Sequence, residues 1–171
     1  MKRPIEANIV IVIALAVAVN ILLYWVTWFA APEFVQSRSP GAPDYLIYVN
    51  FEQAFPLADG WLALAALVGA AGLWKMRDWG YVSALVASGA AIFLGLMDLL
   101  YDLEHAMFVP FTPEAAIELV IVVSMLGLGA LVIALLWRIR GRFFRGQPSA
   151  GSYAGHLVGV DSGATVRPEL D

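Results

Sequence analysis

Residues 7–30 read ANIVIVIALAVAVNILLYWVTWFA, and this long apolar run decides the fold class. No charged residue follows Glu6 within it. A helix needs about 20 apolar residues to cross the hydrocarbon core of a bilayer, and this run supplies them. A secretory signal is the competing interpretation, but the run is too long and ends in Trp28 and Phe29, where a cleavage site requires small residues. The run is therefore predicted to be a transmembrane helix.

Three further apolar runs, at about residues 56–74, 79–102 and 113–137, predict three more spans. The connection at residues 75–78 is so short that spans two and three must be antiparallel neighbours. Pro56 either begins the second helix or kinks a helix that starts near Asp44, and the sequence leaves both open. We predict an all-α, integral membrane four-helix bundle with up-down-up-down topology over residues 1–145. Residues 146–171, rich in Gly, Ser, Ala and Pro, are predicted to be a flexible cytoplasmic tail.

The composition agrees with a chain that faces lipid. Of its 171 residues, 61% are hydrophobic and 14% are charged, whereas soluble proteins carry about 25% charged residues. The chain has no cysteine, which excludes disulfides, thioether-attached haem c and cysteine-ligated iron–sulfur clusters. A divalent cation remains a candidate cofactor. The expected partners are the lipid bilayer and either further copies of the chain or a larger membrane complex, and no nucleic acid is expected.

The distribution of charge predicts the orientation in the membrane. Basic residues mark the cytoplasmic side of short loops. In a four-span chain one side carries Lys2, Arg3, Lys75, Arg77 and the arginines at 138, 140, 142 and 145. The other side carries Arg38 as its one basic residue, together with most of the acidic residues. Both termini are therefore predicted to be cytoplasmic, in a prokaryotic cytoplasmic membrane.

The end of the third span carries unusual polar residues. In the stretch 97–105, MDLLYDLEH, four of them follow the i, i+3, i+4, i+7 spacing that puts side chains on one helix face: Asp98, Tyr101, Asp102 and His105. The C-terminal end of a helix repels anions, whereas the helix starts that carry Asp59 and Glu114 attract them. Asp98 and Asp102 therefore require a compensating contact.

Three kinds of contact would compensate these aspartates. A carboxyl group could hold a proton, a donor such as Arg38, His105, Tyr101 or the Trp61 N–H could pair with it, or a cation could complete the site. The candidate ligand-binding residues are Glu52, Asp59, Asp98, Tyr101, Asp102, His105, Glu114 and Glu118. Asp98, Asp102 and His105 are the candidate metal ligands, since facing helices of a bundle can build carboxylate–histidine sites.

The aromatic residues have a simpler interpretation. Trp25, Trp28, Trp61 and Trp74 lie near the ends of predicted spans, where tryptophan anchors a helix at the membrane surface.

These features favour a small non-enzymatic membrane protein with an acidic pocket on its extracytoplasmic side. The pocket is expected to bind a cation, a proton or a polar lipid headgroup, and the protein could serve as an accessory or interaction subunit. The alternatives are a proton- or cation-coupled transporter and a membrane-embedded enzyme that modifies lipids.

Overall fold

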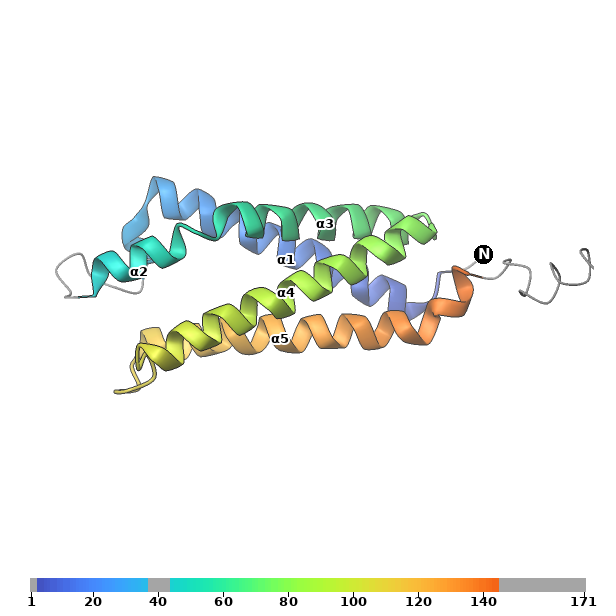
Figure 1. Ribbon diagram of the computed structural model, residues 1–171. Helices are drawn as coiled ribbons and strands as arrows, with labels where there is room; N and C mark the ends of the chain where they lie inside the picture. Colours follow the sequence, from blue (N-terminus) through green and yellow to red (C-terminus); the bar gives the residue numbers. More distant parts are fainter. Residues whose placement is uncertain (1–2, 37–43, 145–171) are drawn as a thin grey trace, which may run out of the picture.

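The computed structural model describes residues 3–36 and 44–144, and within these ranges the chain is helical without strands (Figure 1). The helices are α1 (Ile5–Ala30), α2 (Tyr45–Glu52), α3 (Pro56–Trp74), α4 (Asp78–Glu104) and α5 (Pro113–Ile139), with 3-10 turns η1 (Pro32–Phe34) and η2 (Arg140–Arg142). Four helical segments are long and apolar enough to cross a membrane: Ile5–Ala30, Tyr45–Trp74, Asp78–Glu104 and Pro113–Arg142. The prediction of an all-α chain with four helical segments long and apolar enough to span a membrane is confirmed. The predicted tail at residues 146–171, Lys2, Arg38 and Arg145 lie outside the described residues.

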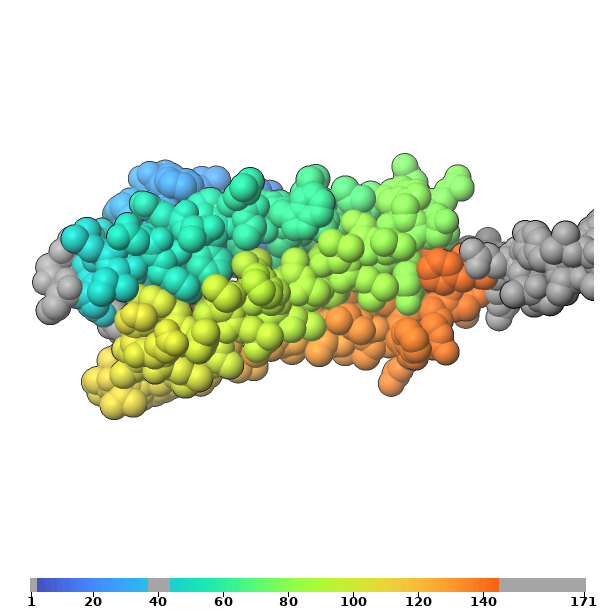
Figure 2. Space-filling view, viewed as in Figure 1, coloured from blue at the N-terminus to red at the C-terminus, as the bar shows by residue number. Residues whose placement is uncertain are grey.

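The long helices pack in a closed order. Helix α1 contacts α3 and α5, and α4 contacts α3 and α5, so each long helix has two neighbours. Figure 1 shows the start of α1 and the end of α5 at the same end of the bundle, with α2 at the opposite end. Large apolar side chains point outward along every long helix, as in Val12, Trp61, Phe93 and Val120. Figure 2 shows the face of the bundle over α3, α4 and α5. An outer surface of large apolar side chains suits lipid contact.

Pro56 begins a helix and does not kink a longer one. Helix α2 ends at Glu52, and α3 begins at Pro56 itself. Proline is favoured in the first turn because its missing N–H has no intrahelical acceptor there. The segment before Pro56 forms the separate short helix α2, which begins at Tyr45. There the Tyr48 side chain is 2% exposed.

Helices α3 and α4 approach most closely at the end where they are joined. A Cβ atom on Gly80 would overlap the backbone of Gly72, and one on Gly69 would lie 2.9 Å from the backbone nitrogen of Ala84. The Ser83 hydroxyl also donates a hydrogen bond of 2.8 Å to the carbonyl oxygen of Ala65 on α3. Small residues and interhelical hydrogen bonds are the usual means of helix association in lipid.

The glycines of α4 and α5 do not all serve this packing. Gly129 is needed for close approach, because a Cβ there would lie 2.7 Å from the Ile92 side chain and 3.0 Å from the Ser88 carbonyl oxygen. At Gly89 and Gly127, a Cβ atom would meet no neighbouring atom within 4 Å. Gly89 and Gly127 therefore do not mark close contacts between helices.

Helices α3 and α4 end in the same way. The N–H of Arg77 donates to the carbonyl oxygen of Gly72, and the N–H of Met76 donates to that of Leu73. This pair of bonds forms a Schellman motif, whose next-to-last residue adopts a left-handed conformation. Met76 takes that position with φ of 52°, and Ala106 takes it at the end of α4 with φ of 51°. The two motifs terminate α3 and α4 without glycine.

The contact between Gly72 and Gly80 leads to a stability prediction. Gly80→Ala should lower the thermal unfolding midpoint in mild detergent, because the added methyl group forces α3 and α4 apart at a cost of about 1–3 kcal/mol. Gly89→Ala is the matched control on the same helix and should leave the midpoint unchanged or slightly raised, since alanine favours helix. Equal effects of the two substitutions would contradict the close contact.

Candidate functional site

The four polar residues near the end of α4 lie on its inward face. Tyr101 and Asp102 are buried, with exposed fractions of 8% and 4%, and Asp98 and His105 are partly buried. Leu103 on the opposite face is 62% exposed. The spacing of these residues in the sequence therefore places them toward the other helices.

Carboxyl groups from four helices meet at this end of the bundle. Glu52 ends α2, Asp59 lies in the first turn of α3, and Glu118 lies in the second turn of α5. The carboxyl group of Glu52 lies close enough to Glu118, Asp98 and Asp59 for electrostatic repulsion, and that of Asp98 close enough to Asp59, Glu118 and Asp102. We call this group the carboxyl cluster: Glu52, Asp59, Asp98, Asp102 and Glu118.

Helix α1 supplies hydrogen bonds to two members of the carboxyl cluster. The Tyr24 hydroxyl donates to Oε2 of Glu52 at 3.0 Å, and the indole N–H of Trp25 donates to Oδ2 of Asp59 at 2.9 Å. The two donors are consecutive residues, so one turn of α1 holds carboxyl groups from both α2 and α3. Hydrogen bonds to a charged acceptor are roughly twice as strong as those between neutral groups. These bonds therefore orient Glu52 and Asp59 and tie α1 to the cluster.

The aromatic donors correct an expectation drawn from the sequence. Trp25 and Trp28 were expected at the membrane surface, but they are buried, with exposed fractions of 8% and 4%. Trp61, which was expected to be able to donate to the aspartates, is 58% exposed, and Trp74 is 62% exposed. Trp61 donates no hydrogen bond to Asp98 or Asp102 within the described residues, and the indole that does reach the carboxyl cluster, that of Trp25, donates to Asp59. The signal in the sequence is that Tyr24 and Trp25 lie at the same end of their span as the acidic residues.

An aromatic stack joins α2 to α4 beside the carboxyl cluster. The ring of Phe51 stacks on Tyr101 with centroids 3.9 Å apart and an interplanar angle of 12°. Tyr101 in turn stacks on His105 at 4.1 Å, and Phe51 contacts Phe55 at 4.8 Å. The Nδ1 atom of His105 lies 2.9 Å from the carbonyl oxygen of Tyr101, so the Nδ1–H tautomer donates a bond that caps α4. His105 and Tyr101 thus hold the end of α4 in place.

Asp98 differs from Glu52 and Asp59 in its contacts. No hydrogen bond to its carboxyl group comes from any residue within 3–36 or 44–144. Its nearest charged neighbours in the carboxyl cluster are acidic. Of Glu52, Asp59 and Asp98, Asp98 is therefore the one whose carboxyl group has no hydrogen-bond donor among the described residues.

Glu114 does not join the carboxyl cluster. Helix α5 begins after Thr112, whose side-chain oxygen accepts a hydrogen bond of 3.3 Å from the backbone N–H of Ala115. Glu114 lies exposed in the first turn, where the helix dipole favours an acid. Its position is explained by the helix start alone.

The carboxyl cluster does not have the geometry of a metal centre. Among residues 3–36 and 44–144, no three aspartate, glutamate or histidine side chains lie so that they could hold a metal ion together. Asp98, Asp102 and His105, the candidate metal ligands, therefore do not form such a group. The carboxyl groups interact through space across the bundle interior, without converging on one coordination point.

No protein-family model, curated protein or solved structure matches the chain.

The bond between Tyr24 and Glu52 can be tested by removing one hydroxyl group. Tyr24→Phe should destabilise the protein by about 1–3 kcal/mol, because it leaves the Glu52 carboxyl group without its donor. Tyr81→Phe is the matched control, since the buried Tyr81 makes ring contacts but no hydrogen bond to a described residue. Thermal unfolding in mild detergent measures both, and a loss of stability no larger in Tyr24→Phe would argue against the bond.

Proposed function

We propose that the protein binds a proton or a hydrated cation at the carboxyl cluster, as a multi-pass protein of a prokaryotic cytoplasmic membrane. The observation that carries this proposal is that carboxyl groups from α2, α3, α4 and α5 lie within electrostatic range of one another at one end of the bundle. In a low-dielectric interior, like charges repel strongly and each carboxylate loses hydration. Binding of a positive species offsets both costs.

The geometry favours a proton or a hydrated ion over a directly coordinated metal. A dehydrated divalent cation requires several oxygen atoms within about 2.0–2.6 Å, and the described carboxyl groups form no such set. A proton needs a single carboxyl group, and a hydrated cation reaches its carboxylates through water. A polar lipid headgroup with a positive charge would act in the same way at the outer edge of the cluster.

Within the carboxyl cluster, Asp98 is the residue we assign to the bound ion. Tyr24 and Trp25 already donate to Glu52 and Asp59. The Asp98 carboxyl group has acidic neighbours and no donor from the described residues. It lies near the C-terminal end of α4, where the helix dipole adds negative potential and attracts a cation.

The proposed orientation follows from the segregation of charge. Lys75, Arg77 and the arginines at 138, 140 and 142 lie at the helix ends opposite the carboxyl cluster. The positive-inside rule then places that end, with both termini, in the cytoplasm and gives an up-down-up-down topology. The carboxyl cluster would face the extracytoplasmic side.

The alternative functions have less support. A coupled transporter requires polar groups that line a path from the cluster to the basic end. Asn20 and Ser124 are exposed on the outer surface instead, and the hydroxyl groups of Ser83 and Ser88 donate to backbone carbonyl oxygens. No described feature points to a lipid-modifying reaction. A cation-responsive accessory subunit of a membrane complex is the setting we favour.

The binding proposal predicts how stability responds to ions. A species that binds only the folded protein raises its stability, by about 2.7 kcal/mol at a hundred times its dissociation constant. We expect the unfolding midpoint in mild detergent to rise when calcium or magnesium is added, or when the pH is lowered so that the cluster takes up a proton. Asp98→Asn should raise the midpoint by itself, by about 1 kcal/mol of relieved repulsion, and weaken the response.

Glu104→Gln is the matched control, because Glu104 is an exposed carboxylate at the same end of α4. It should retain the full response of the unsubstituted protein. If neither cations nor pH alter the midpoint of the unsubstituted protein, the binding proposal fails.

The proposed orientation predicts which loops a reagent reaches. Because the chain has no cysteine, a single introduced thiol gives an unambiguous label. In spheroplasts, a membrane-impermeant maleimide should label Val109→Cys, in the connection before α5, and spare Lys75→Cys, in the connection before α4. Detergent should make both thiols reactive. Labelling of Lys75→Cys but not of Val109→Cys before detergent is added would show that the orientation is opposite to the one proposed.

A further inference from the structure

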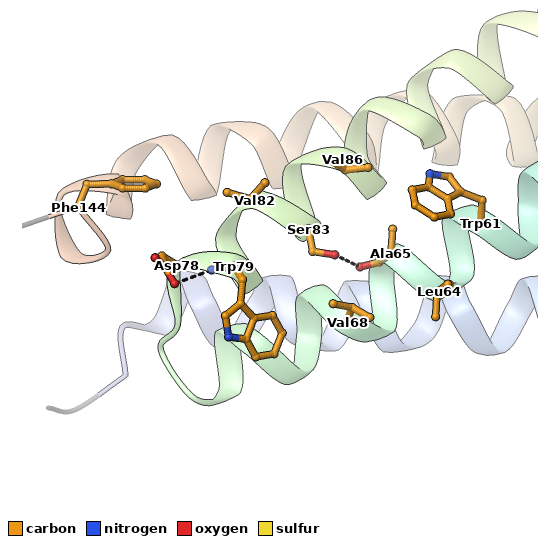
Figure 3. Close-up of a pocket in the computed structure, with 10 residues that line it drawn as sticks. All are labelled: Trp61, Leu64, Ala65, Val68, Asp78, Trp79, Val82, Ser83, Val86 and Phe144. Carbon is orange, nitrogen blue, oxygen red and sulfur yellow. Dashed lines mark hydrogen bonds between the residues drawn. The ribbon is translucent and has the colours of Figure 1, made fainter.

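A groove of about 500 Å³ runs along the outer surface between α3 and α4, separate from the carboxyl cluster (Figure 3). Its walls include Trp61, Leu64 and Val68 of α3 and Val82 and Val86 of α4, and Phe144 lies at one end. Figure 3 shows Trp61 at the other end and, between the two ends, the hydrogen bond from Ser83 to Ala65 that joins the helices. The groove is therefore elongated and mostly apolar, and it opens toward the surrounding lipid.

Two polar groups in the groove wall form hydrogen bonds within the protein. The Ser83 hydroxyl donates to the carbonyl oxygen of Ala65, and Oδ1 of Asp78 accepts from the backbone N–H of Trp79 at 2.9 Å. Most of the remaining lining is aliphatic or aromatic, so a hydrocarbon chain suits it.

The length of the groove matches one leaflet of a bilayer. On α4 the lining extends from Asp78 to Val86, a rise of about 12 Å. On α3 it continues to Trp61, whose Cα lies about 20 Å along the helix from the basic end at Trp74. Half of a hydrocarbon core is about 15 Å. One acyl chain can therefore lie in the groove from the membrane surface to the bilayer centre.

The groove ends at the basic end of the bundle. Arg77 directly precedes α4, and Arg142 closes η2 just before Phe144, and both side chains are exposed. The buried Tyr81 ring contacts Phe143 at 5.3 Å and Phe144 at 5.2 Å, which holds the arginine-rich turn beside the start of α4. Arg77 adjoins the lining residue Asp78, and Arg142 lies two residues before the lining residue Phe144. The two arginines outweigh the single carboxylate of Asp78, so this end of the groove is positive overall and attracts an anion.

We propose that this groove binds one acyl chain of an anionic phospholipid, with the headgroup phosphate held at the Arg77 and Arg142 end. The apolar wall selects the chain, and the two arginines select the charge of the headgroup. The proposal requires that the helices lie in a membrane, but it does not depend on ion binding by the carboxyl cluster. The test of lipid binding can therefore fail without affecting the proposed ion binding. The test of ion binding can likewise fail without affecting the proposed lipid site.

Native mass spectrometry of the detergent-purified full chain tests the acyl-chain contact. Added dioleoyl phosphatidylglycerol should give a retained one-lipid adduct, and dioleoyl phosphatidylcholine a weaker one. Val86→Trp fills the groove and should reduce the phosphatidylglycerol adduct about tenfold. Val120→Trp, on an outward face of α5 where Val120 is 64% exposed, is the matched control and should retain the adduct.

A second comparison tests the headgroup contact with two double variants that each remove two positive charges. The double variant Arg77→Gln with Arg142→Gln should remove most of the preference for phosphatidylglycerol over phosphatidylcholine, about tenfold or more, since each basic residue near an anionic surface contributes to binding. The control is Arg138→Gln with Arg140→Gln, because the Arg140 guanidinium lies over the Trp137 ring and donates to the Trp137 carbonyl oxygen. The control should keep the preference.

Three results would overturn the proposal. Retention of the adduct by Val86→Trp would place the lipid elsewhere. Equal loss of preference in both arginine pairs would show attraction to overall charge without a site. A dimer of the unsubstituted protein that Val86→Trp dissociates would make a second copy of the chain the occupant of the groove.

Discussion

Two neighbouring donors on α1, the Tyr24 hydroxyl and the Trp25 indole N–H, hold the carboxyl groups of Glu52 and Asp59 in the interior of the bundle. The arrangement of the acidic end depends on these bonds, because a carboxylate without a donor is costly in a low-dielectric interior. Beyond Glu6, α1 carries no charged residue of its own. It nevertheless joins α2 and α3 through polar contacts, and the remaining demand for positive charge falls on Asp98.

Different contacts hold the helices together at the two ends of the bundle. At the acidic end, aromatic rings and hydrogen bonds fill the space between helices, as in the stack of Phe51, Tyr101 and His105. At the basic end, Gly72 and Gly80 bring α3 and α4 into backbone contact, and the charged side chains stay on the outside. Buried acidic groups are thus concentrated where the bundle is held by polar contacts, and the arginines lie exposed where the interior is closed.

The sequence predicted the helical membrane class because long uncharged runs have few other solutions. It also predicted that Asp98, Tyr101, Asp102 and His105 share an inward face, since the helical period alone determines this. It did not identify Trp25 as the donor to Asp59, because contacts between residues 34 positions apart depend on how α1 is rotated against α3. The same limit applies to the glycines: Gly129 lies at a close contact and Gly127 does not, and the rotation of α5 decides which of them faces a neighbouring helix. The groove between α3 and α4 could not be predicted from the sequence, because its shape depends on the angle at which the two helices cross.

The backbone contact between Gly72 and Gly80 makes one end of the α3–α4 pair a pivot. The helices are pinned there and separate toward the other end, as Figure 1 shows. Asp98 lies 18 residues beyond Gly80, a lever arm of about 27 Å. A change of about 5° in the crossing angle would move its carboxyl group by about 2 Å relative to α3. Small scissoring of two helices is therefore enough to alter the spacing of charges at the far end.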